Sequence, residues 1–210
     1  MSRLIAVGDI HGRFSKLVDL MEEIKPQKDD TLVFLGDYID RGPKSYDVVD
    51  FILKMGEENP NMITLRGNHE DFVISLFLGN QDQKMRNLWL KLNGGDQTLA
   101  SYKGSGQFLK VHQDFYMNLP VSWETEKYFF CHAGIRPGVP LTKQRAVDLL
   151  EIREPFLNST ADFGKIIVHG HTPVEKPEIL PNRINIDTGA GWNGPLTAIE
   201  LPSYRIWQQW

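Results

Sequence analysis

Three strand–loop–helix units follow one another in the first 78 residues, and this succession constrains the fold more than any other feature of the chain. Short apolar runs at 3–7, 31–35 and 62–65 are typical of buried strands, and the segments 14–25, 45–55 and 70–78 that follow them have helical apolar spacing. Such alternation predicts an α/β fold with a largely parallel sheet and right-handed crossovers. Polar residues that follow these strands should therefore meet at the carboxyl edge of the sheet.

The remainder of the chain does not repeat this unit. Residues 79–118 contain helix-like pieces separated by glycine-containing breaks, and we interpret them as a helical insert. Beyond the insert, the sequence predicts strands at 128–131, 165–168, 184–186, 196–200 and 205–207 and a helix at 143–152. We expect these strands to form a second, mixed or antiparallel sheet on the first. No linker divides the chain, so we expect a single domain over 1–210 with the insert at about 79–118.

Composition argues against several classes of protein. Charged residues make up 24% and hydrophobic residues 41% of the chain, as in ordinary globular proteins. A net charge of −4 disfavours a general nucleic-acid binder, and no apolar run is long enough to cross a membrane. We therefore expect a cytoplasmic protein with no membrane or nucleic-acid partner, and we take a monomer as the default oligomeric state. The lone Cys131 cannot form an internal disulfide and is expected to be a buried structural thiol.

Five short blocks carry the side chains suited to chemistry. They are Gly8-Asp9-Ile10-His11-Gly12, Gly36-Asp37-Tyr38-Ile39-Asp40-Arg41-Gly42, Gly67-Asn68-His69-Glu70, Cys131-His132-Ala133-Gly134 and His169-Gly170-His171-Thr172. Four of them follow a predicted strand. Oxygen and nitrogen donors dominate and there is no Cys-x-x-Cys pair, so manganese, iron, zinc or magnesium suits the blocks better than a thiolate zinc site. A single Asp in a turn is commonly only a turn former, but five blocks in this order favour a metal centre.

In this order the blocks closely resemble the phosphoprotein phosphatases of the calcineurin-like metallophosphoesterase superfamily, particularly short bacterial and phage serine/threonine phosphatases. The resemblance spans residues 8–172. It implies the metallophosphoesterase fold, in which two packed mixed β-sheets are flanked by helices in an α/β/β/α sandwich. It also implies two divalent ions, with manganese favoured. Asp9 and His11 would hold the first ion, Asp37 would bridge both, and the second would be held by Asn68, His132 and His171.

The same resemblance assigns the catalytic and substrate-binding residues. His69 would protonate the leaving oxygen, and Asp40 would orient the His69 imidazole. The alternative is that His69 and Asp40 form only a structural salt bridge. Arg41 and Arg153 would bind phosphoryl oxygens, because a planar guanidinium offers two parallel donors. Arg153 could instead balance a helix dipole. Arg66 is interpreted as structural.

Several residues near the blocks receive a lesser role. His169 is interpreted as a neighbour of the ligand His171. Pro173 stands where superfamily members that cleave phosphodiesters often have a further metal-binding histidine, which favours phosphomonoesters. The loop 187–192 is expected at the rim of the site, where Trp192 could flank the substrate, although a packing role is favoured. The other tryptophans are assigned to packing or to the surface: Trp89, Trp123, Trp207 and Trp210.

We therefore expect a metal-dependent serine/threonine protein phosphatase that hydrolyses phosphomonoesters in phosphoproteins by direct attack of a hydroxide bridging two metals. Phosphotyrosine is a further candidate substrate. The alternative is a hydrolase of diadenosine tetraphosphate, although such enzymes usually have Asp at the position of Glu70 and lack the Tyr38-Ile39-Asp40 pattern. A third hypothesis, an inactive scaffold that binds phosphorylated partners, is disfavoured because the ligand residues, His69 and Arg41 are all present.

Overall fold

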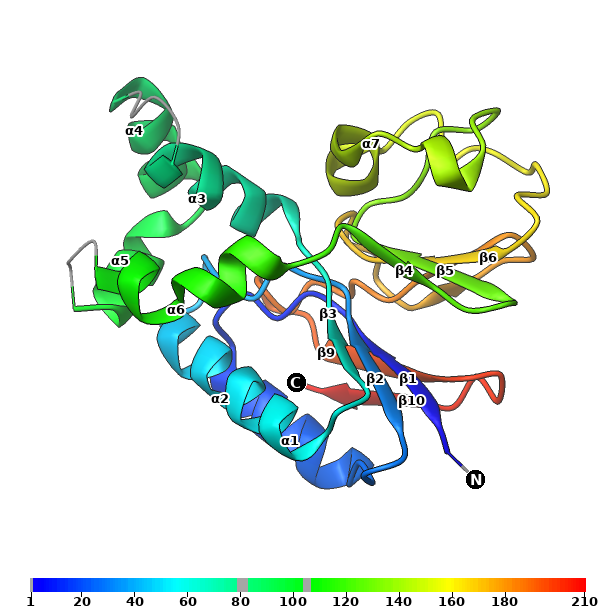
Figure 1. Ribbon diagram of the computed structural model, residues 1–210, viewed down its shortest axis with the longest axis horizontal. Helices are drawn as coiled ribbons and strands as arrows, with labels where there is room; N and C mark the ends of the chain where they lie inside the picture. Colours follow the sequence, from blue (N-terminus) through cyan, green and yellow to red (C-terminus); the bar gives the residue numbers. More distant parts are fainter. Residues whose placement is uncertain (1, 79–82, 104–106) are drawn as a thin grey trace.

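Two five-stranded sheets pack face to face at the centre of the protein (Figure 1). The computed structural model describes residues 2–78, 83–103 and 107–210. The first sheet has the strand order β10-β9-β1-β2-β3 and the second β4-β5-β6-β8-β7. Each sheet combines parallel and antiparallel pairs, and helices flank them. The predicted arrangement of two mixed sheets with helices outside is therefore confirmed.

The first sheet is built around the three predicted strand–helix units. Its parallel strands are β1 (Leu4–Val7), β2 (Thr31–Phe34) and β3 (Met62–Thr64), and α1 (Phe14–Ile24) and α2 (Ser45–Glu58) connect them. The strands β9 (Leu196–Leu201) and β10 (Ile206–Gln209) complete this sheet, with β9 antiparallel to β1. We expected these two strands in the second sheet, and that expectation is wrong. Five of the six residues of β9 are buried, which suits an inner strand of a sheet covered on both faces.

Alternation along the first sheet divides the core into two layers. Ile5 and Val7 face the helices and pack in one cluster with Leu17 of α1 and Val48 of α2. Ala6, between them in β1, belongs instead to the cluster between the two sheets. Successive side chains of a strand point to opposite faces, so one short apolar run contributes to both layers. Full burial of a valine, leucine or isoleucine side chain contributes about 1.5–3 kcal/mol.

The second sheet is covered on its outer face by a short helix and loops. Its strands are β4 (Ser122–Glu124), β5 (Tyr128–Cys131), β6 (Ile166–His169), β7 (Glu178–Ile179) and β8 (Arg183–Asn185). Phe130 faces the first sheet, whereas Phe129 and Cys131 pack outward against α7 (Ala146–Glu151), which follows the 3-10 turn η1 (Leu141–Lys143). The sequence did not predict β4 and β7, because short edge strands carry little apolar pattern. Cys131 is fully buried, as expected.

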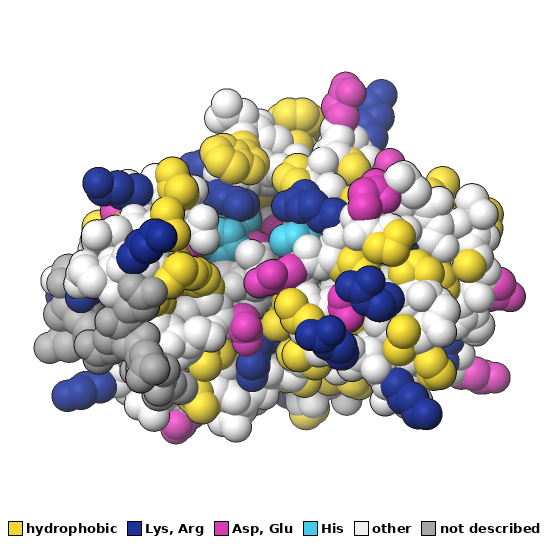
Figure 2. All heavy atoms as spheres, turned by 90° about the horizontal axis from the view of Figure 1, so that it is seen from above, with side chains coloured by type: hydrophobic (Ala, Val, Ile, Leu, Met, Phe, Trp, Pro, Cys, Tyr) yellow, Lys and Arg dark blue, Asp and Glu magenta, His cyan; other side chains and the backbone are white. Residues whose placement is uncertain are grey.

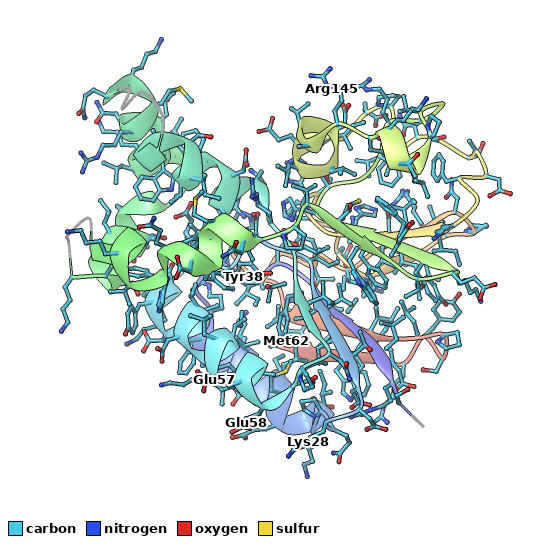
Figure 3. The ribbon with its side chains drawn as sticks, viewed as in Figure 1. Lys28, Tyr38, Glu57, Glu58, Met62 and Arg145 are labelled. Atoms are coloured by element: carbon cyan, nitrogen blue, oxygen red, sulfur yellow. The ribbon has the colours of Figure 1, made fainter. Side chains whose placement is uncertain are left out.

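The predicted insert is helical in its described part. After α3 (Asn68–Leu78) come α4 (Gln83–Leu92), α5 (Gly95–Ser101) and α6 (Gln107–Asn118), while 79–82 and 104–106 lie outside the described residues. Of these helices, α5 and α6 lie beside the end of α2 (Figure 1). Tyr38, just after β2, points toward α6, where its ring contacts Phe115 at a centroid distance of 5.3 Å (Figure 3). Within the described ranges, no helix is both long and apolar enough to span a membrane.

Candidate active site

The predicted ligand residues follow the carboxyl ends of strands in both sheets. Asp9 follows β1, Asp37 follows β2, and Asn68 begins the helix after β3. In the second sheet, His132 follows β5 and His171 follows β6. Parallel strands end at one edge, so the two packed sheets deliver these side chains to one place. Histidine side chains are visible there in the middle of one face, beside lysine or arginine side chains (Figure 2).

Backbone strain is concentrated at this edge. Of the eight non-glycine residues with positive φ in the described chain, five belong to the predicted site. They are His11 (48°), Asp37 (54°), Asp40 (71°), Arg41 (64°) and His171 (65°). Left-handed conformations of non-glycine residues cost on the order of 1–3 kcal/mol each and persist where surrounding contacts enforce them. These backbone conformations therefore lower the stability of the fold, and they direct the five side chains toward the site.

Two groups of ligand atoms share the carboxylate of Asp37. One oxygen or nitrogen atom from each of Asp9, Asp37 and His132 lies within 4.8 Å of the others, and the same holds for His11, Asp37 and His69. All of these residues are buried. A carboxylate in two adjacent groups has the placement that a bridging ligand requires.

Asn68 and His171 lie beside the group that contains His132. The Oδ1 atom of Asn68 is 2.9 Å from Nε2 of His132 and 3.0 Å from Nδ1 of His171. The fold thus brings together all six residues that the sequence predicts as ligands. His169, which we placed outside the ligand set, is absent from both groups; its ring packs against Phe156 at a centroid distance of 5.0 Å.

The hydrogen bonds fix acceptor atoms toward the centre of the site. Nδ1 of His132 lies 2.9 Å from the carbonyl oxygen of Leu35, so Nδ1 carries the donated proton and Nε2 presents a lone pair. That lone pair faces Oδ1 of Asn68 and lies 3.5 Å from Oδ2 of Asp37, both also acceptors. His11 is oriented in the same way, with Nδ1 2.8 Å from the carbonyl oxygen of Ile39. The converging acceptors around Nε2 of His132 have no donor between them, and a cation satisfies such an arrangement, whereas Nε2 of His11 also faces the Arg41 guanidinium.

Electrostatics favour cations at the same place. Burial lowers the pKa of His11 and His132, and lowers that of His171 to about 3, so these imidazoles are neutral and available as ligands. Burial, with the charges of Asp187 and Asp37, raises the pKa of Asp9 well above its usual range. The buried Oδ1 of Asp9 has no hydrogen-bond partner in the described structure. Two divalent cations would relieve this repulsion and satisfy the orphaned oxygen, so the residues present fit the metals that the fold family uses.

His69, which belongs to the group with His11 and Asp37, forms a buried pair with Asp40. Nδ1 of His69 lies 2.6 Å from Oδ2 of Asp40. Burial would lower the pKa of His69, but Asp37 and Asp40 outweigh it and raise the pKa above the ordinary value. The insert completes the pair, because Trp89 Nε1 donates to Asp40 Oδ2 at 2.8 Å and Thr98 Oγ1 donates to Oδ1 at 2.6 Å. Trp89, assigned to packing or to the surface, therefore also orients Asp40.

The two predicted phosphate-binding arginines occupy different environments. The guanidinium of Arg41 contacts Nε2 of His11 and lies 3.2 Å from Nε2 of His69. Arg153 is exposed and donates from Nη1 to Oγ1 of Thr172 at 3.2 Å. Arg66 is paired with Asp71 at 3.0 Å, in keeping with its structural interpretation.

Glu70 supports the site, although the sequence analysis used it only to compare families. Its fully buried carboxylate accepts hydrogen bonds from the backbone N–H groups of Gly67, Asp37 and Tyr38 at 2.9–3.0 Å. Burial, with the charge of Asp37, raises the pKa of Glu70 to about 8, while these donors oppose the rise. Glu70 thus fixes the loop that presents Asp37. The available signal was an acid in the block itself, in the first turn of the helix that begins at Asn68.

The loop 187–192 lies against the site, as expected. A Cβ atom on Gly191 would stand 2.6 Å from Cδ2 of His11, so the loop approaches too closely for any larger residue there. Asp187 is buried next to Asp9, and burial raises the pKa of Asp187 to about 6. Trp192 is 58% exposed, which contradicts the favoured packing interpretation.

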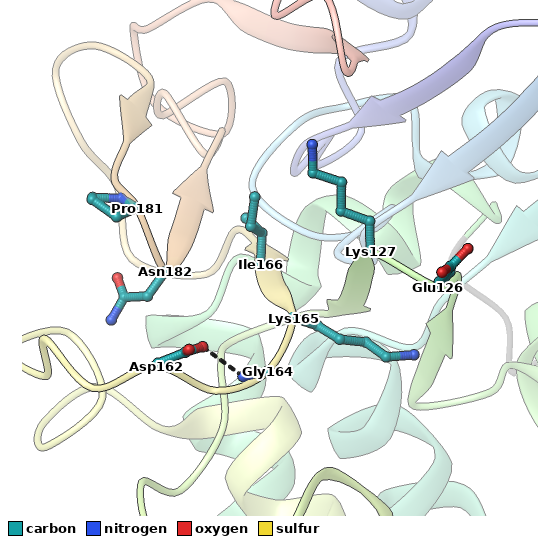
Figure 4. Close-up of a pocket in the computed structure, with 8 residues that line it drawn as sticks. All are labelled: Glu126, Lys127, Asp162, Gly164, Lys165, Ile166, Pro181 and Asn182. Carbon is teal, nitrogen blue, oxygen red and sulfur yellow. Dashed lines mark hydrogen bonds between the residues drawn. The ribbon is translucent and has the colours of Figure 1, made fainter.

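A separate pocket lies at the opposite edge of the second sheet (Figure 4). It is lined in part by Lys127, Ile166 and Asn182, which stand at or just before the starts of β5, β6 and β8. Lys165, at its wall, is already paired with Glu124 at 2.9 Å. The ligand residues follow the other ends of β5 and β6, so this pocket is distinct from the candidate active site.

Comparisons with known proteins agree with this geometry. The family model described as calcineurin-like phosphoesterase matches residues 2–205. The chain is 29% identical to the bis(5'-nucleosyl)-tetraphosphatase PrpE [asymmetrical] of Anoxybacillus flavithermus, over 93% of this chain and 89% of that protein. A solved structure named "Crystal structure of a putative diadenosine tetraphosphatase" has a TM-score of 0.72 at 22% identity and covers 99% of this chain and 93% of its own.

A protein serine/threonine phosphatase from Saccharomyces cerevisiae shares the fold as well. Its TM-score is 0.67 at 16% identity, with coverage of 99% of this chain and 79% of that one. The family model spans nearly the whole chain. The fold brings together buried His and Asp side chains that form a site suited to divalent metals. The protein accordingly belongs to the calcineurin-like phosphoesterase family.

Proposed function

We propose that this protein is a two-metal phosphohydrolase that cleaves dinucleoside tetraphosphates asymmetrically. The observation that carries the hydrolase assignment is the carboxylate of Asp37 shared by two ligand groups, one of which contains His69 paired with Asp40. The substrate class is supported by the relative from Anoxybacillus flavithermus, whose printed name is a bis(5'-nucleosyl)-tetraphosphatase and which aligns with 93% of this chain.

The proposed ligand set is the one that the family resemblance implies; by distance alone, Asp9 groups with Asp37 and His132, and His11 groups with Asp37 and His69. Asp9 and His11 would hold one ion, Asp37 would bridge, and the second ion would be held by Asn68, His132 and His171. When bound, the two cations supply Lewis-acid polarisation of a phosphoryl oxygen and lower the pKa of a water molecule. We propose manganese as the native ion, because oxygen and imidazole donors suit it.

The remaining polar side chains would donate the proton to the leaving oxygen and bind the negatively charged phosphoryl oxygens. Nδ1 of His69 is engaged by Asp40, so the transferable proton of the imidazolium sits on Nε2 and can pass to the departing oxygen. Arg41, which lies 3.2 Å from that same nitrogen, is placed to bind phosphoryl oxygens next to the acid. Arg153 would bind a more exposed oxygen of the substrate.

A phosphoprotein phosphatase is the second candidate. The block Asp37-Tyr38-Ile39-Asp40-Arg41 and the acid Glu70 favour it, since this pattern resembles protein phosphatases more than tetraphosphatases. Both candidates would use the same metals, acid and arginines. They differ in what occupies the space outside the metal centre, and a shared fold does not decide that.

One comparison of substrates tests the proposal. We would measure kcat/KM for diadenosine tetraphosphate and for a phosphothreonine peptide with one manganese-loaded preparation, and identify the nucleotide products by chromatography. The proposal expects higher efficiency on the dinucleotide, with ATP and AMP as products. Higher efficiency on the peptide would overturn the substrate assignment in favour of the second candidate. The variant His69→Asn controls for contaminating activity, because its rates should fall on both substrates.

A further inference from the structure

Trp192 is an exposed aromatic side chain at the rim of the active site. It is 58% exposed, and the guanidinium carbon of Arg41 lies 4.9 Å from the centroid of its ring. The same guanidinium contacts His11 and His69 in the centre of the site. The indole is therefore one side-chain contact away from the residues proposed to act on phosphate.

The backbone that carries Trp192 is held firmly. Arg13 donates to the carbonyl oxygens of Ala190 at 3.2 Å and Gly191 at 3.0 Å. The N–H of Trp192 donates to the carbonyl oxygen of Gly189 at 2.9 Å, and Lys16 holds the carbonyl oxygen of Gly194 at 2.7 Å. Gly191 also lies directly against the ring of His11. A fixed backbone combined with an open indole makes a preorganised surface.

A single exposed tryptophan is ordinary on a protein surface. What distinguishes Trp192 is the charged group beside its ring. The guanidinium of Arg41 lies over the indole, and such a contact is attractive because the ring face carries negative charge. A planar group stacking on the open indole surface would continue this arrangement. Stacking of a base on an aromatic side chain is worth about 1–3 kcal/mol and tolerates different bases.

We propose that Trp192 is the stacking platform for one nucleobase of the substrate. The proposal rests on the proposed function and deepens it, because it places a base beside the loop 187–192 while the phosphate chain extends past Arg41 to the metal ligands. It predicts a preference for nucleotides over base-free polyphosphates of equal charge. It also predicts little discrimination among bases, because a stacking surface reads no hydrogen-bond pattern.

The test separates the indole from the phosphate chain. We would compare Trp192→Leu, Trp192→Phe and the exposed-tryptophan control Trp210→Leu in KM and kcat for diadenosine tetraphosphate, and in the inhibition constant of inorganic tripolyphosphate. We expect Trp192→Leu to raise KM about tenfold, equivalent to about 1.4 kcal/mol, with kcat and the tripolyphosphate constant unchanged. Trp192→Phe should retain most of the affinity, and Trp210→Leu should match the parent protein. An equal weakening of tripolyphosphate would overturn the platform, because Trp192 would then act only by positioning Arg41.

A binding measurement keeps this inference separable from the proposed function. AMP should quench the tryptophan fluorescence of the manganese-loaded parent protein and of Trp210→Leu, and the quenching should be lost in Trp192→Leu. Quenching without turnover of diadenosine tetraphosphate would support the base subsite while the proposed function failed. Turnover without quenching, with KM unchanged in Trp192→Leu, would overturn the subsite and leave the proposed function standing.

Discussion

Replacing Trp89 with phenylalanine removes one donor from the buried carboxylate of Asp40 and keeps an aromatic ring in the core. Asp40 is fully buried and accepts from Trp89 Nε1 at 2.8 Å, His69 Nδ1 at 2.6 Å and Thr98 Oγ1 at 2.6 Å. A hydrogen bond to a charged group contributes about 1.5–3 kcal/mol to stability. The substitution also removes part of a fully buried ring, and that packing cost must be measured separately.

Trp207 supplies the matched control. It is 2% exposed, and its Nε1 has no hydrogen-bond partner within the described part of the chain. Trp207→Phe therefore removes the same atoms from a buried site without removing a hydrogen bond. We expect Trp89→Phe to lower the free energy of unfolding by about 1.5–3 kcal/mol more than Trp207→Phe does.

Urea denaturation of both variants in metal-free buffer measures this difference, with linear extrapolation at a common slope. Metal-free conditions keep cation binding from adding to the apparent stability. If the two variants differ by less than about 0.5 kcal/mol, which is within the usual error of additivity, the hydrogen bond from Trp89 to Asp40 does not stabilise the protein as argued.

Three further outcomes follow from the site. His69→Asn should lower kcat about 100- to 10,000-fold, the usual contribution of a general acid, while metal content measured by mass spectrometry stays at the parent value; unchanged kcat would exclude His69 as the acid. Although burial lowers the pKa of His69, Asp37 and Asp40 outweigh burial and raise that pKa above its ordinary value. Because the acid must be protonated, kcat should fall as pH rises through that raised pKa; a pH–rate profile with the opposite slope would contradict this. Asp37→Ala should lower manganese content far more than Asn68→Ala does, because Asp37 belongs to both ligand groups; equal losses would argue against a bridging carboxylate.

The elements of the first sheet were predictable because their signals are local. Apolar runs followed by helical spacing gave β1, β2 and β3 with α1 and α2, each to within a few residues. The membership of β9 and β10 was not predictable, since a strand's partners depend on contacts far along the chain: Leu4 of β1 lies opposite Leu201 of β9. The short strand β7 was not predicted for a different reason: a strand of two residues shows no periodicity in the sequence.

At the site, the sequence supplied candidate residues. Asp9, His11 and Asp37 lie in short blocks after predicted strands, and the order of five such blocks, with the family resemblance, identified them as candidate ligands. Their convergence on a common point followed from the rule that parallel strands end at one edge of a sheet. The order of the blocks therefore predicted both a metal centre and the fold class.

Only the tertiary structure decided how those residues are supported. The donor from Trp89 to Asp40 joins positions 49 residues apart, and no periodicity in α4 indicates that its indole meets that carboxylate. The exposed ring of Trp192 beside Arg41 likewise depends on the close approach of Gly191 to His11. Local sequence sets backbone preference and side-chain chemistry, whereas burial and long-range partners arise when separate segments compete for one volume, and only the folded chain resolves that competition.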